Sequence, residues 1–273
     1  MRVAIQGREG SFHEQAAERL LGADVEVVPC PTFPKVFEAL RTGAVDRGLA
    51  AVENSLHGSI NDVYRLLLSP DVWVAGEVFL HIEQHLIAAS DLPLASIERV
   101  LSQEPALAQC EQWLALNLPD AVLEITHDTA ESVRTVLARP DVPWAAVASD
   151  RAAQAYGGRL LAGPINDDPH NYTRFFLLAG ERVVVDGANR TSVVLTTSHD
   201  PGALWHALGA FESAGINLSK LDSHPIAGDR RHYRFYVDLE AGLHEERCTQ
   251  ALAALKEQGC TVHVLGSYIA GAF

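Results

Sequence analysis

The sequence predicts an α/β protein that ends in a second, smaller unit. Three observations support this fold class. Strand-like apolar runs alternate with helical patterns from residue 2 to about residue 160, which is typical of a parallel sheet covered by helices. A polar stretch at residues 181–190 then contains Gly187 and indicates a boundary. After it, the pattern becomes β-α-β-β-α-β, the split βαβ arrangement.

The first part of the chain predicts one lobe, from residue 1 to about 76. Ser11 and Glu14 are spaced as a capping box, so a helix is expected to begin at Phe12, and Gly22 marks its end. Strands are expected at residues 2–6, 25–28 and 49–52, and helices at 12–21, 32–41 and 60–68. The order β-α-β-α-β-α favours parallel strands.

Residues from about 77 to 160 predict a second lobe of the same kind. A strand is expected at residues 72–75, before this lobe, and strands within it at 78–89, 100–101, 122–126 and 145–148. Helices are expected at 105–116, at 128–137, where Asp128 and Glu131 are spaced as a capping box, and at 150–156. A later strand opens at Thr173 and continues through the apolar run 175–179. We expect it to return to the first lobe, with residues 161–182, so that a cleft lies between two lobes.

The carboxyl-terminal unit is expected to hold four strands and two helices. The strands are predicted at residues 192–197, 216–221, 233–239 and 260–265, and the helices after Gly202 and at 245–256. Leu204, Leu208 and Phe211 share one face of the first helix, which predicts packing of that face on the sheet.

Composition excludes several classes of function. The formal net charge is −14, which disfavours nucleic-acid binding because phosphates need a basic surface. The four cysteines form no Cys-x-x-Cys pair, so we expect reduced thiols in a cytoplasmic protein. No apolar run reaches the length of a membrane span, and no secretion signal is expected at the N-terminus.

Several polar residues stand where strands meet loops. Thr173 and Arg174 open a buried strand, and Asn54 and Ser55 follow another, where α/β folds place ligands. Asn54 or Ser55 alone would also fit an ordinary turn. The loop 7–11 precedes a helix and offers free amides, but it lacks a P-loop lysine and dinucleotide glycine spacing, so a carboxylate is favoured over a nucleotide.

Five segments in order carry a resemblance. Residues 7–11 (Gly-Arg-Glu-Gly-Ser), 53–58 (Glu-Asn-Ser-Leu-His-Gly), 102–110 and 171–175 (Asn-Tyr-Thr-Arg-Phe) resemble the signatures of prephenate dehydratase, and residues 202–225 resemble an ACT domain. The resemblance implies a two-lobed, periplasmic-binding-protein-like dehydratase domain at 1–182 and a ferredoxin-like βαββαβ ACT domain at 190–273. It also implies that this domain follows the dehydratase part as a regulatory sensor.

The implied reaction converts prephenate to phenylpyruvate in L-phenylalanine biosynthesis, by loss of carbon dioxide and water, without a metal or other cofactor. Thr173 matches the essential threonine and is expected to hydrogen-bond the departing hydroxyl. The resemblance further assigns catalytic positions to Asn54, Ser102 and Gln109, and substrate-binding positions to Ser11, Ser55, Arg174 and Phe175. Gln103-Glu104-Pro105 departs from the family's His-Pro-Gln, which weakens the assignment of Ser102.

Three of these residues keep alternatives. Arg174 either clamps a carboxylate or pairs with an acidic neighbour. Phe175 is expected to pack beneath the site rather than to take part in the chemistry. Gln109 lies in a predicted helix and would equally fit a solvated surface.

The resemblance implies phenylalanine binding and feedback at interfaces of the ACT domain, in a homodimer or homotetramer. The matching positions are Gly202, Ala203, Leu204, Asn217, Leu218, Asp222 and Ser223. His224 stands where the family favours arginine, which removes a permanent cation.

Other interpretations stay open. The chain would also fit arogenate dehydratase, a solute-binding protein on the same scaffold, or a regulator of a partner enzyme. His81, Glu83 and His85 would share one face of a strand, but their order is not that of a zinc protease. Asp167-Asp168 suggests a glycosidase pair without further support. Chorismate mutase activity is expected to come from another protein.

Overall fold

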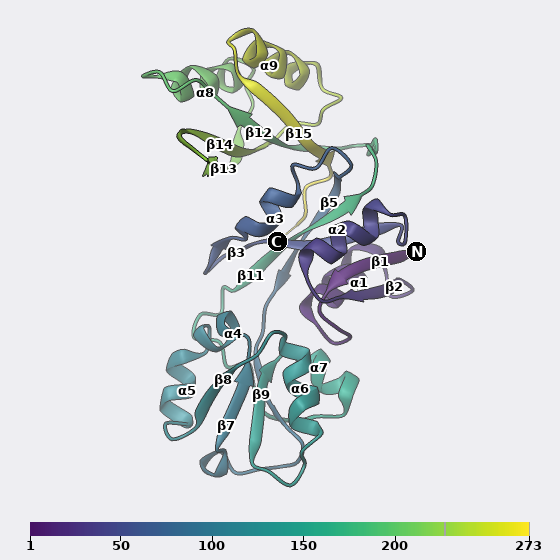
Figure 1. The fold of residues 1–273 in the computed structure, drawn as a ribbon, viewed down its shortest axis with the longest axis vertical. Helices are drawn as coiled ribbons and strands as arrows, with labels where there is room; N and C mark the ends of the chain where they lie inside the picture. Colours follow the sequence, from purple (N-terminus) through teal and green to yellow (C-terminus); the bar gives the residue numbers. More distant parts are fainter. Residues whose placement is uncertain (227, 273) are drawn as a thin grey trace. The chain divides into compact units, whose positions relative to one another are not determined.

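The computed structural model describes residues 1–226 and 228–272 (Figure 1). Their packing divides them into two compact units. Unit 1 comprises residues 1–64 and 78–175, and unit 2 comprises residues 65–77 and 176–272. Two strands, β5 (Trp73–His81) and β11 (Tyr172–Ala179), contribute residues to both units. The division therefore falls inside continuous strands rather than in a linker.

The first lobe of unit 1 is built on a parallel sheet. Strand β1 pairs in parallel with β2 and β3, β4 pairs antiparallel with β3, and β11 is the next strand beyond β3. The strands are β1 (Arg2–Gln6), β2 (Glu26–Cys30), β3 (Arg47–Asn54) and β4 (Gly58–Ser59), and the helices are α1 (Phe12–Leu21), α2 (Phe33–Arg41) and α3 (Asn61–Leu66). The β-α-β-α-β order predicted from the sequence is confirmed here.

Helix α1 begins where its cap predicts. The Ser11 hydroxyl accepts a hydrogen bond from the Glu14 amide at 3.3 Å, and the helix ends at Leu21 before Gly22. The Glu14 carboxylate accepts from the Gly10 amide at 2.5 Å, one residue earlier than a capping box would use. These two bonds hold the loop before α1 against its first turn.

The second lobe of unit 1 has a separate sheet with the strand order β10-β6-β9-β7-β8. Its strands are β6 (His85–Ala88), β7 (Arg99–Ser102), β8 (Val122–Ile125), β9 (Trp144–Ala148) and β10 (Arg159–Ala162), and its helices are η1 (Leu94–Ser96), α4 (Glu104–Ala108), α5 (Glu111–Asn117), α6 (Thr129–Leu137) and α7 (Asp150–Tyr156). Val100 packs with Leu107, whereas its neighbour Leu101 packs with Val133. Buried clusters thus cover both faces of the sheet, as the alternation of side chains along a strand requires.

Several predicted elements of this lobe are corrected by the structure. The helix expected at 105–116 is broken into α4 and α5 at Gln109 and Cys110. The strands expected at 72–75 and 78–89 are instead β5 and β6, so His81 and His85 do not share one strand. Residues 159–162 form a strand that pairs with β6, and the chain leaves the second sheet only after Ala162.

Unit 2 contains a four-stranded antiparallel sheet in the order β13-β14-β12-β15, with β5 beside β15. Its elements run β12 (Arg190–Thr196), α8 (Ala203–Ser213), β13 (Leu218–Ile226), β14 (Asp229–Leu239), α9 (Glu246–Glu257) and β15 (Thr261–Tyr268). Phe211 of α8 and Leu255 of α9 are buried against Val193 and Val237 of the sheet. The predicted β-α-β-β-α-β order is therefore present, with β13 longer than expected.

None of the helices in the described residues has the length and apolar character that a bilayer crossing requires.

Candidate active site

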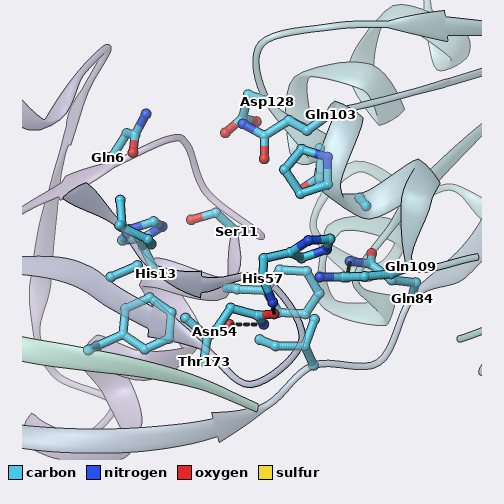
Figure 2. A pocket seen from close by; sticks show the side chains of 18 of the residues that line it. Gln6, Ser11, His13, Asn54, His57, Gln84, Gln103, Gln109, Asp128 and Thr173 are labelled. Atoms are coloured by element: carbon cyan, nitrogen blue, oxygen red, sulfur yellow. Dashed lines mark hydrogen bonds between the residues drawn. The ribbon is translucent and has the colours of Figure 1, made fainter. Parts of the chain in front are cut away.

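A cavity of about 440 Å³ opens inside unit 1 and is lined by both of its lobes (Figure 2). Ser11, Asn54 and Thr173 come from the first lobe, and Gln84 and Gln109 from the second. The described residues that line the cavity include no lysine and no arginine. A negatively charged ligand would therefore be held by neutral donors.

Asn54 and Thr173 form a hydrogen-bonded pair in this cavity, drawn as a dashed line in Figure 2. Asn54 is the last residue of β3, and Thr173 is the second residue of the neighbouring strand β11. The Asn54 Nδ2 donates to the Thr173 Oγ1 at 3.1 Å. The same amide nitrogen lies 2.8 Å from the Asn171 Oδ1 and 3.2 Å from the Tyr172 carbonyl, so its two hydrogens serve three acceptors. Because the threonine oxygen accepts here, its own proton is left for another acceptor.

The other end of the Asn54 side chain shapes the loop after β3. Its Oδ1 accepts from the amides of Leu56 at 3.0 Å and His57 at 3.1 Å, an Asx-type turn. Asn54 therefore acts in a turn and in the cavity at once. The sequence offered these two interpretations as alternatives, and the structure combines them.

Ser55 does not enter the cavity. Its hydroxyl donates to the His170 carbonyl at 2.9 Å and accepts from the Tyr172 amide at 3.0 Å. Both bonds go to the backbone just before and at the start of β11. The predicted substrate contact is therefore replaced by a structural one, which fixes the strand that carries Thr173.

The alternation of side chains along β11 separates Thr173 and Phe175 from Arg174. Thr173 and Phe175 line the cavity, whereas Arg174 does not and is only 4% exposed. The Arg174 Nη1 lies 3.9 Å from the Glu53 Oε2, and the guanidinium lies 5.7 Å from the centre of the Phe79 ring. Of the two alternatives for Arg174, the structure favours the pairing with an acidic neighbour over a carboxylate clamp.

The loop 7–11 brings Ser11 to the cavity by packing closely on the second lobe. Gly10 has φ +82°, and a Cβ at this position would lie 2.7 Å from the Cα of Ala152 in α7. The Gly10 carbonyl accepts from the Ser149 hydroxyl at 2.7 Å. Glycine is required at position 10 for both its conformation and its close contact.

The second lobe contributes a pair of glutamines. The Gln84 Nε2 donates to the Gln109 Oε1 at 3.1 Å, and both residues are more than nine-tenths buried. Gln109 lies at the break between α4 and α5. It is thus a cavity residue rather than a solvated helix residue, and the broken helix is what positions it.

Ser102 is a corrected prediction. It is the last residue of β7, but it is fully buried and does not line the cavity. Its hydroxyl donates to the Val147 carbonyl at 2.6 Å in the adjacent strand β9. The side chain is occupied inside the sheet, so the structure gives it no access to a ligand.

Sequence reasoning assigned no ligand role to several residues that line the cavity, including His13, His57, Gln84 and Asp128. His57 lies inside the motif 53–58, and Asp128 was interpreted only as a helix cap. The Asp128 carboxylate does cap α6 by accepting from the Glu131 amide at 2.7 Å. His13 lies two residues after Ser11 in the first turn of α1, and this closeness to a predicted site residue was the one feature of the sequence that pointed to it.

Burial shifts the titration of two lining residues. Desolvation lowers the pKa of His13 to about 4, so the imidazole is neutral at neutral pH. Desolvation also raises the pKa of Asp128 above its ordinary value, although hydrogen bonds from the Glu131 and Ala130 amides oppose this effect.

The predicted regulatory residues all lie in unit 2, where Gly202, Ala203 and Leu204 line a second cavity of about 350 Å³. Asn217 donates to the Glu240 carboxylate at 2.9 Å, and Leu218 begins β13. Asp222 and Ser223 lie within β13. The His224 Nε2 lies 2.9 Å from the Asp222 Oδ2, in the position where the family favours arginine.

The metal and glycosidase interpretations gain no support. The described residues contain no group of three or more His, Cys, Asp or Glu side chains that could hold a metal ion. Asp167 accepts from the amides of Gln112 at 2.9 Å and Trp113 at 3.0 Å, and Asp168 accepts from the His170 amide at 2.7 Å. The two aspartates serve the local backbone.

Comparisons with known proteins place the chain in one family. The family model for prephenate dehydratase matches residues 3–183. A bifunctional chorismate mutase/prephenate dehydratase of Aquifex aeolicus is 38% identical over 98% of this chain and 73% of its own length. An arogenate dehydratase/prephenate dehydratase of Arabidopsis thaliana is 40% identical over 98% of this chain and 72% of its own length.

Two solved structures are similar over nearly the whole chain. Prephenate dehydratase of Arthrobacter aurescens in complex with L-Phe has a TM-score of 0.88 at 31% identity and covers 98% of this chain and 90% of its own. A protein described as a quorum quenching acylase has a TM-score of 0.88 at 27% identity and covers 99% and 98%. The family model, the two sequence relatives and the Arthrobacter structure all carry dehydratase names. The chain therefore belongs to the prephenate dehydratase family and is an enzyme of that class.

Proposed function

We propose that the cavity of unit 1 binds prephenate and that Thr173 donates a hydrogen bond to its departing hydroxyl. One observation carries the proposal: the Asn54 Nδ2 donates to the Thr173 Oγ1 at 3.1 Å, which orients the threonine proton away from Asn54. Among the described residues, no hydrogen bond uses that proton. A hydroxyl whose oxygen already accepts a bond is also a better donor.

The reaction requires such a donor because hydroxide is a poor leaving group. The bond between C1 and its carboxylate breaks, carbon dioxide leaves, and the electron pair moves through the ring to expel the hydroxyl from C4. A hydrogen bond to that oxygen stabilises the charge that develops on it in the transition state. The ring becomes aromatic, and the product is phenylpyruvate.

The remaining lining residues bind the substrate. We assign Ser11 to a carboxylate and place Gln109, paired with Gln84, at the opposite wall of the cavity. Phe175 supplies an apolar surface beneath the ring. Ser55, Ser102 and Arg174 are left out of the proposed contacts, because their side chains are engaged elsewhere in the fold.

The test of this proposal is an assay of purified protein with prephenate. Phenylpyruvate formation is followed by absorbance in alkali, and Thr173→Ser is compared with Thr173→Val. The serine variant keeps a hydroxyl and is expected to retain most activity, whereas the valine variant keeps the shape and loses the donor. Equal activity of both variants and the wild type would contradict the proposal.

Arogenate is a second candidate substrate. The Arabidopsis relative, 40% identical, carries both dehydratase names. The absence of lysine and arginine among the described lining residues, together with the Asp128 carboxylate, is compatible with a substrate that carries an ammonium group. Measuring kcat/KM for both substrates in the same preparation decides between them.

We further propose that residues 1–182 form the catalytic domain and residues 190–273 an ACT domain that binds phenylalanine and feeds back on catalysis. The β-α-β-β-α-β order of the second part and the cavity at Gly202–Leu204 support this assignment. The solved relative from Arthrobacter aurescens is described in complex with L-Phe. The proposed contacts are those of Gly202, Ala203, Leu204, Asn217, Leu218, Asp222 and Ser223, in a homodimer or homotetramer.

Calorimetric titration with phenylalanine, tyrosine and tryptophan tests the effector, and light scattering on the same sample gives the oligomeric state. We expect heat on addition of phenylalanine together with inhibition of phenylpyruvate formation. No heat and no inhibition would remove the regulatory part of the proposal and leave the catalytic part intact.

A further inference from the structure

His13, which lines the cavity, carries a buried polar atom without a partner. The Nε2 of His13 is enclosed and makes no hydrogen bond within the described residues. Leaving such an atom unpaired costs about 1–3 kcal/mol, so native proteins rarely keep one without a reason. His13 lines the cavity with Thr173 and Phe175, and Figure 2 shows its imidazole among the lining side chains. A bound ligand would supply the missing partner.

Two aromatic rings fix the position of the imidazole. The His13 ring lies edge-on to Phe175, with ring centres 5.0 Å apart, and tilted against Phe33, with ring centres 5.8 Å apart. Phe175 follows Thr173 by two residues on the same face of β11. Residues at this spacing lie roughly 7 Å apart along a strand. His13 therefore packs against the next residue after Thr173 on the cavity face of β11.

The chemistry of the proposed substrate decides what the imidazole contacts. Prephenate carries two carboxylates and a ketone, all of which accept hydrogen bonds, against one hydroxyl that can donate. The oxygen-rich groups are attached at C1, across the ring from the leaving hydroxyl at C4. Because no described lining residue is a lysine or arginine, these oxygens require neutral N–H and O–H donors.

Resting on the proposed function, we infer that His13 is a substrate-binding residue whose Nε2–H donates to an oxygen at the C1 end of the substrate. Thr173 and His13 then hold opposite ends of one ring. The neutral imidazole suits this role, since it offers a donor without the cost of burying a charge.

Three variants of the full chain test this inference in the prephenate assay. Glutamine at position 13 can place its amide near the Nε2 position, asparagine can reach only the Nδ1 position, and leucine removes both. We expect His13→Leu to lower kcat/KM about 10- to 100-fold, as loss of a hydrogen bond to a charged group does, with the change mainly in KM. His13→Gln should recover most of this loss, and His13→Asn should not.

A matched control is His263→Gln, since His263 is half-buried in β15 of unit 2 and is not among the residues that line this cavity. This change should leave kcat/KM unaltered. Thermal unfolding of each variant identifies any that is misfolded, and if His13→Leu is misfolded the comparison of Gln with Asn carries the test.

The inference is overturned if folded His13→Leu retains kcat/KM within about threefold, or if Gln and Asn behave alike. Rescue by Asn instead of Gln would also overturn it, because it would assign the contact to the other nitrogen. Failure of the proposed function has a different signature: the wild-type protein itself would not convert prephenate.

Discussion

Asn54 and Ser102 each end a strand of unit 1 that pairs in parallel with a neighbour, yet only Asn54 reaches the cavity. Asn54 lies where β3 gives way to a loop, and its side chain contacts Thr173 of the next strand. Ser102 ends β7 with its side chain turned into the sheet, where it is bonded to Val147. A position at the carboxyl end of a strand is thus insufficient: the side-chain direction decides whether a polar residue meets the ligand.

The largest loss of activity is expected from a change at Thr173, which is bonded to Asn54 and not to Ser102. Thr173→Ala should lower kcat by about 100- to 1,000-fold, the usual loss for one donor aimed at developing charge. The fold should be retained, because Thr173 is only half-buried and its bond to Asn54 is one of several in that loop. Steady-state kinetics and circular dichroism check both points. A rate near that of the wild type would remove Thr173 from the mechanism.

The next effect tests the direction of the hydrogen bond. Asn54→Asp keeps an oxygen for the Leu56 and His57 amides but replaces the donor to Thr173 with an acceptor. The Thr173 proton should then turn toward residue 54, and kcat should fall about 10- to 100-fold, for a lost hydrogen bond to a charged centre. Thermal unfolding should show that the loop is intact. Unchanged kcat would mean that Thr173 does not need its partner.

Ser102→Ala should behave in the opposite manner. We expect a loss of stability of about 1–3 kcal/mol, because the Val147 carbonyl loses its partner in a buried sheet. The values of kcat and KM should stay within about twofold of the wild type. Urea unfolding and the prephenate assay measure the two quantities, and a large kinetic loss with unchanged stability would restore Ser102 to the site.

The last prediction concerns the dependence of stability on pH, which leaves activity at neutral pH unchanged. The folded-state pKa of His13 is about 4, below the ordinary 6.5, so the stability that the neutral ring contributes is complete above pH 6.5. It is lost as the pH falls toward 4, and the loss approaches about 3 kcal/mol at the limit. Phe33 and Phe175 face the ring from α2 and β11 and do not titrate. The free energy of unfolding should therefore fall less steeply between pH 6.5 and pH 4 in His13→Leu than in the wild type.

Local signals predicted the elements whose ends are set by local bonds. The caps Ser11 and Asp128 fixed the starts of α1 and α6, and both predictions are confirmed. Strand β10 (Arg159–Ala162) was not predicted. Two of its four residues are exposed and two are only partly buried, so it has no clear apolar pattern, and it forms a strand by pairing with β6. That pairing is a long-range event with no signal in the segment itself.

The contrast between local and long-range signals also holds for the residues of the site. The sequence motifs pointed to five residues that line one cavity in the structure: Ser11, Asn54, Gln109, Thr173 and Phe175. The period of two along β11 implied that Arg174 faces away from Thr173, but not which of them faces the ligand. The position of His13 in the cavity wall was not predicted, because it depends on packing against Phe175, which lies 162 positions later in the chain.

A double-mutant cycle between Asn54→Asp and Thr173→Ala, measured as kcat with prephenate, tests the central claim most directly. If Asn54 acts by orienting the Thr173 proton, the second change should add little once the first is present. The double variant should then match Thr173→Ala within about threefold. Losses that multiply in full would show that the two residues act independently, and would contradict the account.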